Sequence, residues 1–471
     1  MNIVTSSPLA VTAVWSPRVF LGAQLLAVIT VCGAAGLWTP KTYPDTESYV
    51  ETSKMSFREA LISPRTLGYP ALLRVAAVLA PDYRAVPWLH AGILCAAVLF
   101  MDFGVRRFGA APWEAFAFSS GFLYATVQTP WTIAAILTDF SACVMAGAAI
   151  ASLFWVVGER KSWAAWCLLT LTLAASYHIR PGYLFLIPVV PCLGGLLVRI
   201  RAKHGGDRVA WDWYLPALFG VAVVPLLAYS LLRMLVVDDF GLVAMGGDTS
   251  SGLAAELLDW KLVDKELPER YRPLAVAILR ERERRGIQSA FEGGLRISMR
   301  RYEDQFSLNI YNITSPAAEK IYGTDRVVFN RELRNYSRAV LGLRKGEYLL
   351  WAGYMIPRTV SKIAYRGWFL WLSVPLAALL AAVRRRKFRG TAASAALRNA
   401  LQIPPILTAT CWLAALFYLG VVTVLIMAAS YADSRLVMPS ALFLPSLLML
   451  LIVREFRLLN RVLREDEKSG P

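Results

Sequence analysis

The chain has 471 residues, of which 56% are hydrophobic and only 18% are charged, a balance that excludes an ordinary soluble protein. A formal net charge of +17 would suit either nucleic acid or anionic lipid as a partner. The basic residues fall in short loops between apolar stretches, without an aromatic-interleaved basic groove, which excludes nucleic acid. Six cysteines lie in or beside the apolar stretches without a CxxC pair, which favours simple packing over disulfides or a metal site.

Apolar segments that approach the roughly 20 residues of a membrane-spanning helix recur along the chain. We expect about ten of them, at 18–38, 86–105, 113–129, 139–157, 163–177, 181–198, 213–235, 366–383, 403–429 and 436–453. The predicted fold is an all-α polytopic membrane protein. It divides into a transmembrane module (1–235) with a first extracytoplasmic loop (39–85), a mostly helical extracytoplasmic insertion (236–365), C-terminal transmembrane helices (366–453) and a basic cytoplasmic tail (454–471).

Basic residues distinguish the two sides of the predicted membrane domain. One side receives Arg106-Arg107, Arg160-Lys161, Arg199–Lys203, Arg384–Lys387 and the tail. The positive-inside rule makes this side cytoplasmic, with both termini inside, and we expect a bacterial plasma membrane protein. The other side then holds the first loop, turns near Pro130, Tyr177-His178 and Tyr431–Arg435, and the insertion.

An acidic segment, Tyr43–Tyr49, follows the first apolar helix and carries Asp45 and Glu47. Charged groups at a membrane edge are costly unless they are used. One interpretation is structural: Thr42 would cap a helix, with Asp45 in the third position of a capping box. The other interpretation is that Asp45 takes part in a reaction, and the residue types alone do not decide between the two.

The same segment predicts an interfacial helix over 45–61, on which Asp45, Ser48 and Tyr49 share one face at i, i+3 and i+4. Asp139 opens an apolar helix on the same side. It is either a helix-start carboxylate, favoured by about 0.3–1 kcal/mol from the helix dipole, or a functional group.

Three arginines, Arg65, Arg180 and Arg435, lie on this side as well. Each alone could extend to the lipid headgroups. Together, opposite the cytoplasmic positive charge, they favour a phosphate site, because arginine suits phosphate binding. A carboxylate would then deprotonate an acceptor hydroxyl while the arginines hold and stabilise a departing lipid phosphate.

This pattern resembles the GT-C superfamily of membrane glycosyltransferases, which use polyprenyl-phosphate sugars. The resembling segments are Pro44–Tyr49, Arg65–Pro70, Thr138-Asp139, Arg180-Pro181, and Asp433–Leu436 with Pro439. The resemblance implies a polyprenyl-phosphate sugar as donor and a glycan, lipid or protein as acceptor. It also implies Asp45 as catalytic base, Asp139 as an acidic partner for acceptor or metal, Glu47 as a positioning or metal-linked carboxylate, and Arg180 and Arg435 as donor-phosphate ligands.

Other residues keep two interpretations. Tyr49 and Tyr69 could stack on sugar rings, and His178 could bind substrate or serve only as a structural hydrogen bonder. A divalent cation held by Asp45 and Asp139 stays an open alternative. Segment 246–252 has the composition of a flexible connector. Two rival functions share these features: a transporter or flippase of a lipid-linked or anionic solute, and a polymerase or ligase that uses diphosphate-linked oligosaccharides.

Overall fold

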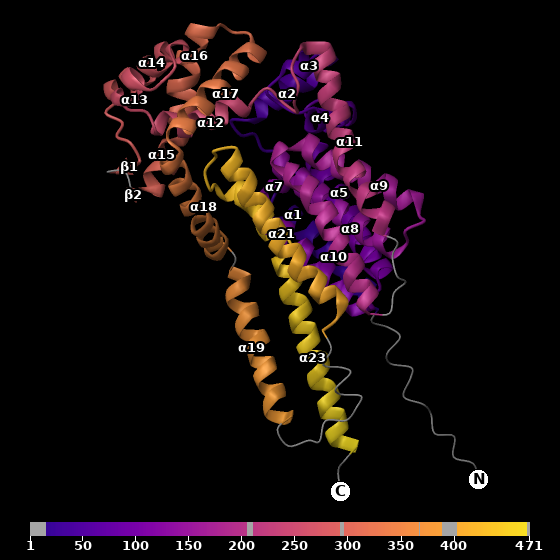
Figure 1. The fold of residues 1–471 in the computed structure, drawn as a ribbon. Coiled ribbons are helices and arrows are strands. Elements are labelled where there is room, and N and C mark those ends of the chain that lie inside the picture. The colour runs from indigo at the N-terminus through magenta and orange to yellow at the C-terminus, as the bar shows by residue number, and fades with distance from the viewer. Residues whose placement is uncertain (1–15, 205–210, 293–295, 367, 389–402, 469–471) are drawn as a thin grey trace, which may run out of the picture.

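The computed structural model describes residues 16–204, 211–292, 296–366, 368–388 and 403–468, and these residues are largely helical (Figure 1). Each predicted apolar segment coincides with a helix. The helices of the N-terminal part and the C-terminal part are α1 (Pro17–Ala34), α2 (Thr46–Lys54), α3 (Phe57–Ile62), α4 (Gly68–Leu79), α5 (Val86–Phe108), α6 (Pro112–Val127), α7 (Trp131–Ala134), α8 (Thr138–Gly158), α9 (Trp163–Ile179), α10 (Leu186–Lys203), α11 (Trp211–Val237), α19 (Trp368–Phe388), α21 (Pro405–Met427), α22 (Ser434–Val437) and α23 (Leu444–Lys468). Turns of 3₁₀ helix at Pro181–Phe185 and Met438–Ala441 precede α10 and α23.

Within the described residues, seven apolar helices are long enough to cross a membrane, which confirms an α-helical membrane protein. They span Pro17–Ala34, Val86–Phe108, Thr138–Gly158, Pro181–Lys203, Trp213–Val237, Pro405–Met427 and Arg435–Asn460. The other predicted spans correspond to α6, α9 and α19, whose apolar stretches are shorter. The boundary placed at 453 falls inside α23, because that helix continues without a break to Lys468.

Helices α5 and α8 pack closely where Gly104 meets the backbone of Ala151. A Cβ added at Gly104 would lie 2.3 Å from the Ala151 carbonyl oxygen. We therefore expect Gly104→Val to lower the free energy of unfolding by about 1–3 kcal/mol through overpacking. Thermal unfolding in detergent measures this, with Gly92→Val on the same helix as control, because a Cβ there meets nothing within 4 Å. Equal melting of the two variants would contradict the expectation.

Basic loops meet at one end of this bundle. Arg107 pairs with Glu159, and the Arg201 guanidinium donates to the carbonyl oxygens of Val157 (2.6 Å) and Gly158 (2.5 Å). The loop that carries α2 and α3 lies at the opposite end (Figure 1). The predicted separation of the basic loops from the acidic segment therefore exists in space.

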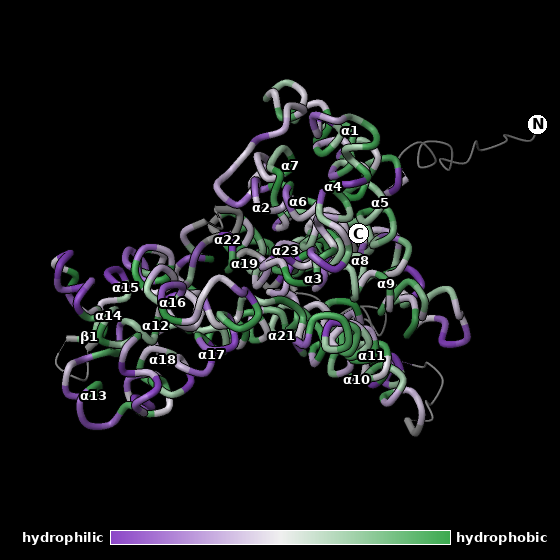
Figure 2. Tube along the Cα trace, turned by 90° about the horizontal axis from the view of Figure 1, so that it is seen from above, coloured by the Kyte–Doolittle hydropathy of each residue, from purple (hydrophilic) through white to green (hydrophobic). Residues whose placement is uncertain are grey.

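The insertion forms a separate helical lobe beside the bundle, with more hydrophilic segments than the bundle (Figure 2). Its elements are α12 (Gly246–Glu256), α13 (Trp260–Lys265), a 3₁₀ turn (Glu269–Tyr271), α14 (Arg272–Arg284), β1 (Phe291–Glu292), β2 (Arg296–Ile297), α15 (Met299–Ser307), a π-helix (Leu308–Thr314), α16 (Ser315–Tyr322), α17 (Arg326–Leu343) and α18 (Lys345–Arg366). The strands β1 and β2 pair antiparallel, and α18 leads down to α19, which packs along α23 (Figure 1).

The connector predicted over 246–252 is wrong, because these residues begin α12. Gly247 is needed there for close helix packing: a Cβ at this position would lie 2.3 Å from the Asn330 carbonyl oxygen of α17. The Gly247 N–H also donates to the Asn330 side chain at 2.8 Å. Gly247 belongs to the glycine- and serine-rich composition that suggested a loop, and here it allows α12 to contact α17.

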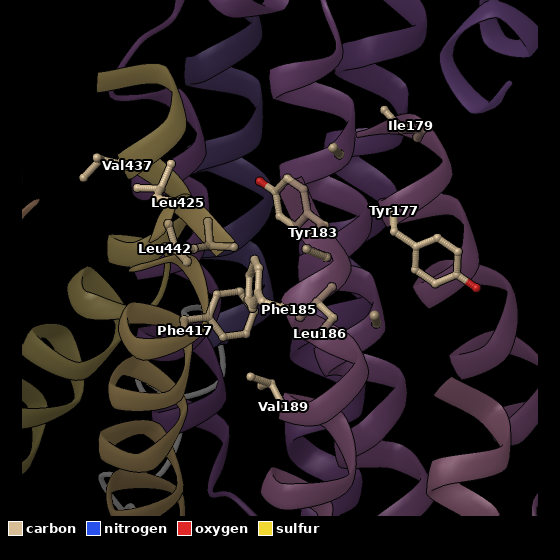
Figure 3. Packing of buried hydrophobic residues seen from close by; sticks show 14 of the residues in the cluster. Tyr177, Ile179, Tyr183, Phe185, Leu186, Val189, Phe417, Leu425, Val437 and Leu442 are labelled. Atoms are coloured by element: carbon tan, nitrogen blue, oxygen red, sulfur yellow. The ribbon is translucent and has the colours of Figure 1, made fainter. Parts of the chain in front are cut away.

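An aromatic core joins the N-terminal helices to the C-terminal ones. The rings of Phe185 and Phe417 meet edge to face at 5.1 Å, and Leu442 lies nearby (Figure 3). A Cβ at Gly420 would lie 2.6 Å from Phe185, so α21 can approach only because this residue is glycine. This packing fixes α21 and the segment after it, which carries Arg435, against the N-terminal bundle.

Candidate functional site

The first loop is attached to the segment that precedes α8 by a short backbone bridge. The Lys41 N–H donates to the Ala134 carbonyl (2.8 Å), and the Ile136 N–H donates to the Lys41 carbonyl (3.0 Å). The Thr46 hydroxyl donates to the Ile136 carbonyl at 3.1 Å. These bonds place the start of α2, with Asp45, beside the start of α8, with Asp139.

Arg65 binds the predicted polar face of α2. Its guanidinium donates to the Ser48 hydroxyl (2.7 Å), to the Tyr49 hydroxyl (3.2 Å) and to Asp45 Oδ1 (2.9 Å). The predicted face formed by Asp45, Ser48 and Tyr49 is therefore confirmed. The helix itself is shorter than predicted, because Ser56 forms a capping box that starts α3 as a separate helix.

Asp45 occupies the N-cap position of α2, but its side chain makes no capping hydrogen bond. The Tyr43 N–H donates instead to the Thr46 hydroxyl at 2.8 Å. The capping interpretation of Asp45 is therefore wrong. Its carboxylate binds guanidinium groups from two distant parts of the chain.

Arg435 connects the two aspartates. Its Nη2 atom lies 2.9 Å from Asp139 Oδ2 and 3.6 Å from Asp45 Oδ2. Asp139 also pairs with Arg180. The side chains Arg65, Asp45, Arg435, Asp139 and Arg180 thus form one alternating row of cations and anions, which we call the ionic row.

The Thr138 hydroxyl forms hydrogen bonds with Arg180 of the ionic row and with Tyr49. The Arg180 guanidinium donates to the Thr138 hydroxyl at 3.3 Å, and the Tyr49 hydroxyl lies 3.4 Å from the same oxygen. These bonds link the two ends of the ionic row through one residue of α8. The orientation of Arg180 is therefore fixed from two sides.

Exposure separates the members of the ionic row. Solvent reaches 41% of the Asp45 side chain and 33% of Arg435, but only 13% of Asp139. Asp45 and Arg435 are therefore the groups that a ligand can reach. Asp139, held between two arginines at the start of α8, orients them and balances their charge.

A pocket of about 590 Å³, including its open mouth, lies directly beside the ionic row. Asp139, Arg180 and Arg435 form its polar side. Its remaining lining residues come from the end of α6 and the turn after it, from α7, from α8, and from the 3₁₀ turns and the residue after the second of them: Ala125, Thr126, Thr129, Trp131, Thr132, Phe140, Cys143, Tyr183, Pro439 and Leu442. A charged head with an apolar extension would match this lining.

Three predicted substrate contacts, Tyr49, Tyr69 and His178, pack against other side chains of the protein. Tyr69 is fully buried, and its ring meets Tyr49 edge to face at 5.4 Å. Tyr49 is also buried, its hydroxyl accepts a hydrogen bond from Arg65, and the Arg65 guanidinium lies over its ring. Tyr49 therefore positions Arg65, and Tyr69 packs against Tyr49. The ring of His178 packs against Tyr229, with ring centroids 4.5 Å apart.

His178 nevertheless has a structural role through its backbone. A Cβ at Gly68 would lie 2.6 Å from the His178 carbonyl carbon, so α4 crosses α9 with almost no space between them.

Glu47 is exposed, and within the described ranges no ion pair joins it to the row. Glu47 was predicted as a site residue because it lies two residues from Asp45 in the same acidic segment.

The structure also bears on the metal alternative. In the described part of the chain there is no group of three or more His, Cys, Asp or Glu side chains arranged to hold a metal ion. Asp45 and Asp139 have guanidinium groups as their neighbours. These side chains therefore fit an anionic ligand better than a cation.

A second ionic pair, Asp248 with Arg326 (2.6 Å), lies in the insertion and was not predicted from the sequence. Asp248 is buried, and desolvation raises the pKa of its carboxyl, while Arg326 and Ser315 act to lower it. A raised pKa in the folded state means that this group contributes most stability at low pH and loses that contribution as pH rises through the folded pKa.

We expect Arg326→Gln to leave the buried Asp248 carboxylate without its cation. The free energy of unfolding should fall by about 1–3 kcal/mol at neutral pH. The loss should become smaller as pH falls, because protonation of Asp248 removes the buried charge that Arg326 balances. Thermal unfolding as a function of pH checks it, with Arg331→Gln on the exposed face of α17 as control; a loss that does not vary with pH would contradict it.

Comparison with protein-family models, with curated proteins and with solved structures finds no match to this chain. Its function is therefore argued from the ionic row and the pocket alone.

Proposed function

We propose that this protein is a membrane glycosyltransferase of the GT-C type, which transfers a monosaccharide from a polyprenyl-phosphate donor to an acceptor hydroxyl. The observation that carries this proposal is the ionic row beside a mostly apolar pocket, which Asp139, Arg180 and Arg435 line. Asp45 lies 3.6 Å from Arg435 at the partly exposed part of the row. A guanidinium with a neighbouring exposed carboxylate matches a donor phosphate and an acceptor hydroxyl.

The proposed step is a displacement at the anomeric carbon. The acceptor oxygen forms a bond to that carbon, and its proton passes to the Asp45 carboxylate. The bond between the anomeric carbon and the bridging oxygen breaks, and its electron pair leaves with polyprenyl phosphate. Arg435, supported by Arg180, stabilises the negative charge that develops on the phosphate. A phosphate diester that leaves as a monoester needs little protonation, so no dedicated acid is required.

Donor binding also explains how Asp45 becomes free to act. The Asp45 carboxylate shares Arg435 with Asp139. A phosphate group, which binds guanidinium strongly, would draw Arg435 toward the donor. Asp45 would then keep only Arg65, which holds it in place.

The same proposal includes the topology. The ionic row would lie at the extracytoplasmic edge of a bacterial plasma membrane, with both termini in the cytoplasm and about ten transmembrane helices. The pocket would receive the first part of the polyprenyl chain from the bilayer, and a glycan, lipid or protein acceptor would approach from outside.

Product analysis with a panel of polyprenyl-phosphate sugars tests the proposal. Purified protein in lipid nanodiscs should release polyprenyl phosphate and form a glycosylated product with at least one donor. Turnover only with diphosphate-linked oligosaccharides would instead assign a polymerase or ligase. Passage of an intact solute across proteoliposomes, with no covalent change and no acceptor, would assign a transporter or flippase.

A further inference from the structure

Tyr183 lines the same pocket as Arg180 and Arg435. It follows Arg180 by three residues, and its N–H donates to the Arg180 carbonyl at 3.0 Å. The turn Pro181–Phe185 is a 3₁₀ helix, in which side chains three residues apart lie on one side. This local geometry explains why a phenol and a guanidinium from one short segment reach the same pocket.

The Tyr183 hydroxyl is buried and unpaired. The residue is 1% exposed, and among the described residues its hydroxyl has no hydrogen-bond partner. The Cys143 thiol is a neighbour, but sulfur is a weak hydrogen-bond partner. In Figure 3 the hydroxyl points away from Phe185 and the aromatic core. Because burying an unpaired hydroxyl is unfavourable, a ligand in the pocket gives this group a reason to be there.

A second hydrogen-bond donor at this pocket also lacks an acceptor. The Nε atom of Arg435 is buried and has no partner within the described part of the chain, although Nη2 of the same side chain donates to Asp139 at 2.9 Å. Two unpaired donors favour a ligand that carries several acceptor oxygens. Phosphate is such a ligand, and its negative charge also suits the guanidinium groups.

The rest of the pocket matches a lipid phosphate better than a free one. Ala125, Phe140 and Leu442 contribute apolar side chains to its lining. A free phosphate would leave this surface unused, whereas an isoprenoid chain attached to the phosphate would remove it from water. The pocket therefore combines unpaired hydrogen-bond donors with an apolar surface, as a polyprenyl phosphate requires.

We propose that Tyr183 is a phosphate-binding residue, whose hydroxyl donates a hydrogen bond to a phosphate oxygen of the donor beside Arg435. This inference rests on the proposed function and deepens it by adding a neutral hydrogen-bond donor to the two arginines. A neutral donor orients the phosphate without placing a third cation in a buried position, where an additional charge would be costly.

Binding of farnesyl phosphate to the full chain in lipid nanodiscs tests this inference, with empty nanodiscs as the blank in titration calorimetry. Tyr183→Phe keeps the ring and removes only the hydroxyl. We expect this variant to bind farnesyl phosphate about 10- to 100-fold more weakly, because a hydrogen bond to a charged group is lost. Without ligand it should melt at the wild-type temperature or above, because the hydroxyl has no partner in the described protein to lose.

Tyr177→Phe is the matched control. Tyr177 is also fully buried, and its hydroxyl is likewise unpaired within the described ranges. It is not part of the pocket lining, and Figure 3 shows its hydroxyl pointing to the opposite side from that of Tyr183. The Tyr177→Phe protein should therefore bind farnesyl phosphate with wild-type affinity.

Three results would overturn the inference. Wild-type affinity of Tyr183→Phe would leave its hydroxyl to a buried water molecule. An equal loss of affinity in Tyr177→Phe would show that the effect does not depend on the pocket. A loss of affinity that comes with a lower melting temperature would give the Tyr183 hydroxyl a structural role. Failure of farnesyl phosphate to bind the wild type would instead contradict the proposed function, and this inference with it.

Discussion

Replacing Asp45 by asparagine is expected to abolish sugar transfer while the protein still folds and binds donor. The substitution keeps the size of the side chain and its oxygen for Arg65, but it removes the group that takes the proton. General-base catalysis is worth about 10²–10⁴ in rate. The turnover number should therefore fall by at least that range, measured as release of polyprenyl phosphate under saturating donor.

Asp82→Asn is the matched control for this experiment. Asp82 lies in the same loop and is half exposed. It pairs with Arg84 at 2.5 Å, and neither residue belongs to the ionic row. It should keep wild-type turnover. Wild-type turnover by Asp45→Asn itself would remove Asp45 from the role of base.

The second large effect concerns Arg435. Arg435→Gln removes the exposed cation that lies between Asp45 and Asp139. A charge-assisted hydrogen bond contributes about 1.5–3 kcal/mol, so we expect farnesyl phosphate to bind roughly 10- to 100-fold more weakly. Arg435→Lys should recover only part of this affinity, because lysine cannot bind phosphate with two parallel hydrogen bonds.

Arg84→Gln removes an exposed arginine of the first loop and should leave donor affinity unchanged. The dependence of binding on salt gives a second measure, since loss of a phosphate-binding cation should make it shallower. An Arg435→Gln protein with wild-type affinity and wild-type salt dependence would show that the phosphate binds elsewhere.

Sequence reasoning located the ionic row because charge beside an apolar segment of membrane length is conspicuous. Asp45 follows such a segment, Asp139 begins one and Arg435 lies between two of them, where a carboxylate or guanidinium is costly without a partner. Helical spacing added Ser48 and Tyr49. The particular pairs, such as Arg435 between two aspartates, depend on contacts between segments far apart in the chain.

The same reasoning did not predict the pair of Asp248 and Arg326. The insertion is polar along much of its length, so one more aspartate or arginine carries no signal there. Sequence reasoning also predicted Tyr69 as a substrate contact, because residue type and position do not reveal burial. Only the packing of α4 against its neighbours places that ring in the core.

The helices were predictable for a different reason. Apolar segments of membrane length have few alternatives to helix, because their backbone groups must be satisfied internally. The break between α2 and α3 was not predicted, since it depends on one capping box at Ser56. The glycines at 246 and 247 suggested a loop because the contact that requires Gly247 lies on a distant helix, α17.

The central claim is that the donor is cleaved between the anomeric carbon and its oxygen. It is tested most directly with a polyprenyl-phosphate sugar that carries ¹⁸O in the bridge between sugar and phosphorus. We expect the label to leave entirely with the released polyprenyl phosphate, as analysed by mass spectrometry. Label retained in the sugar product would mean cleavage at phosphorus, and an intact donor after full incubation with acceptors would mean no transfer; either result would contradict the proposed function.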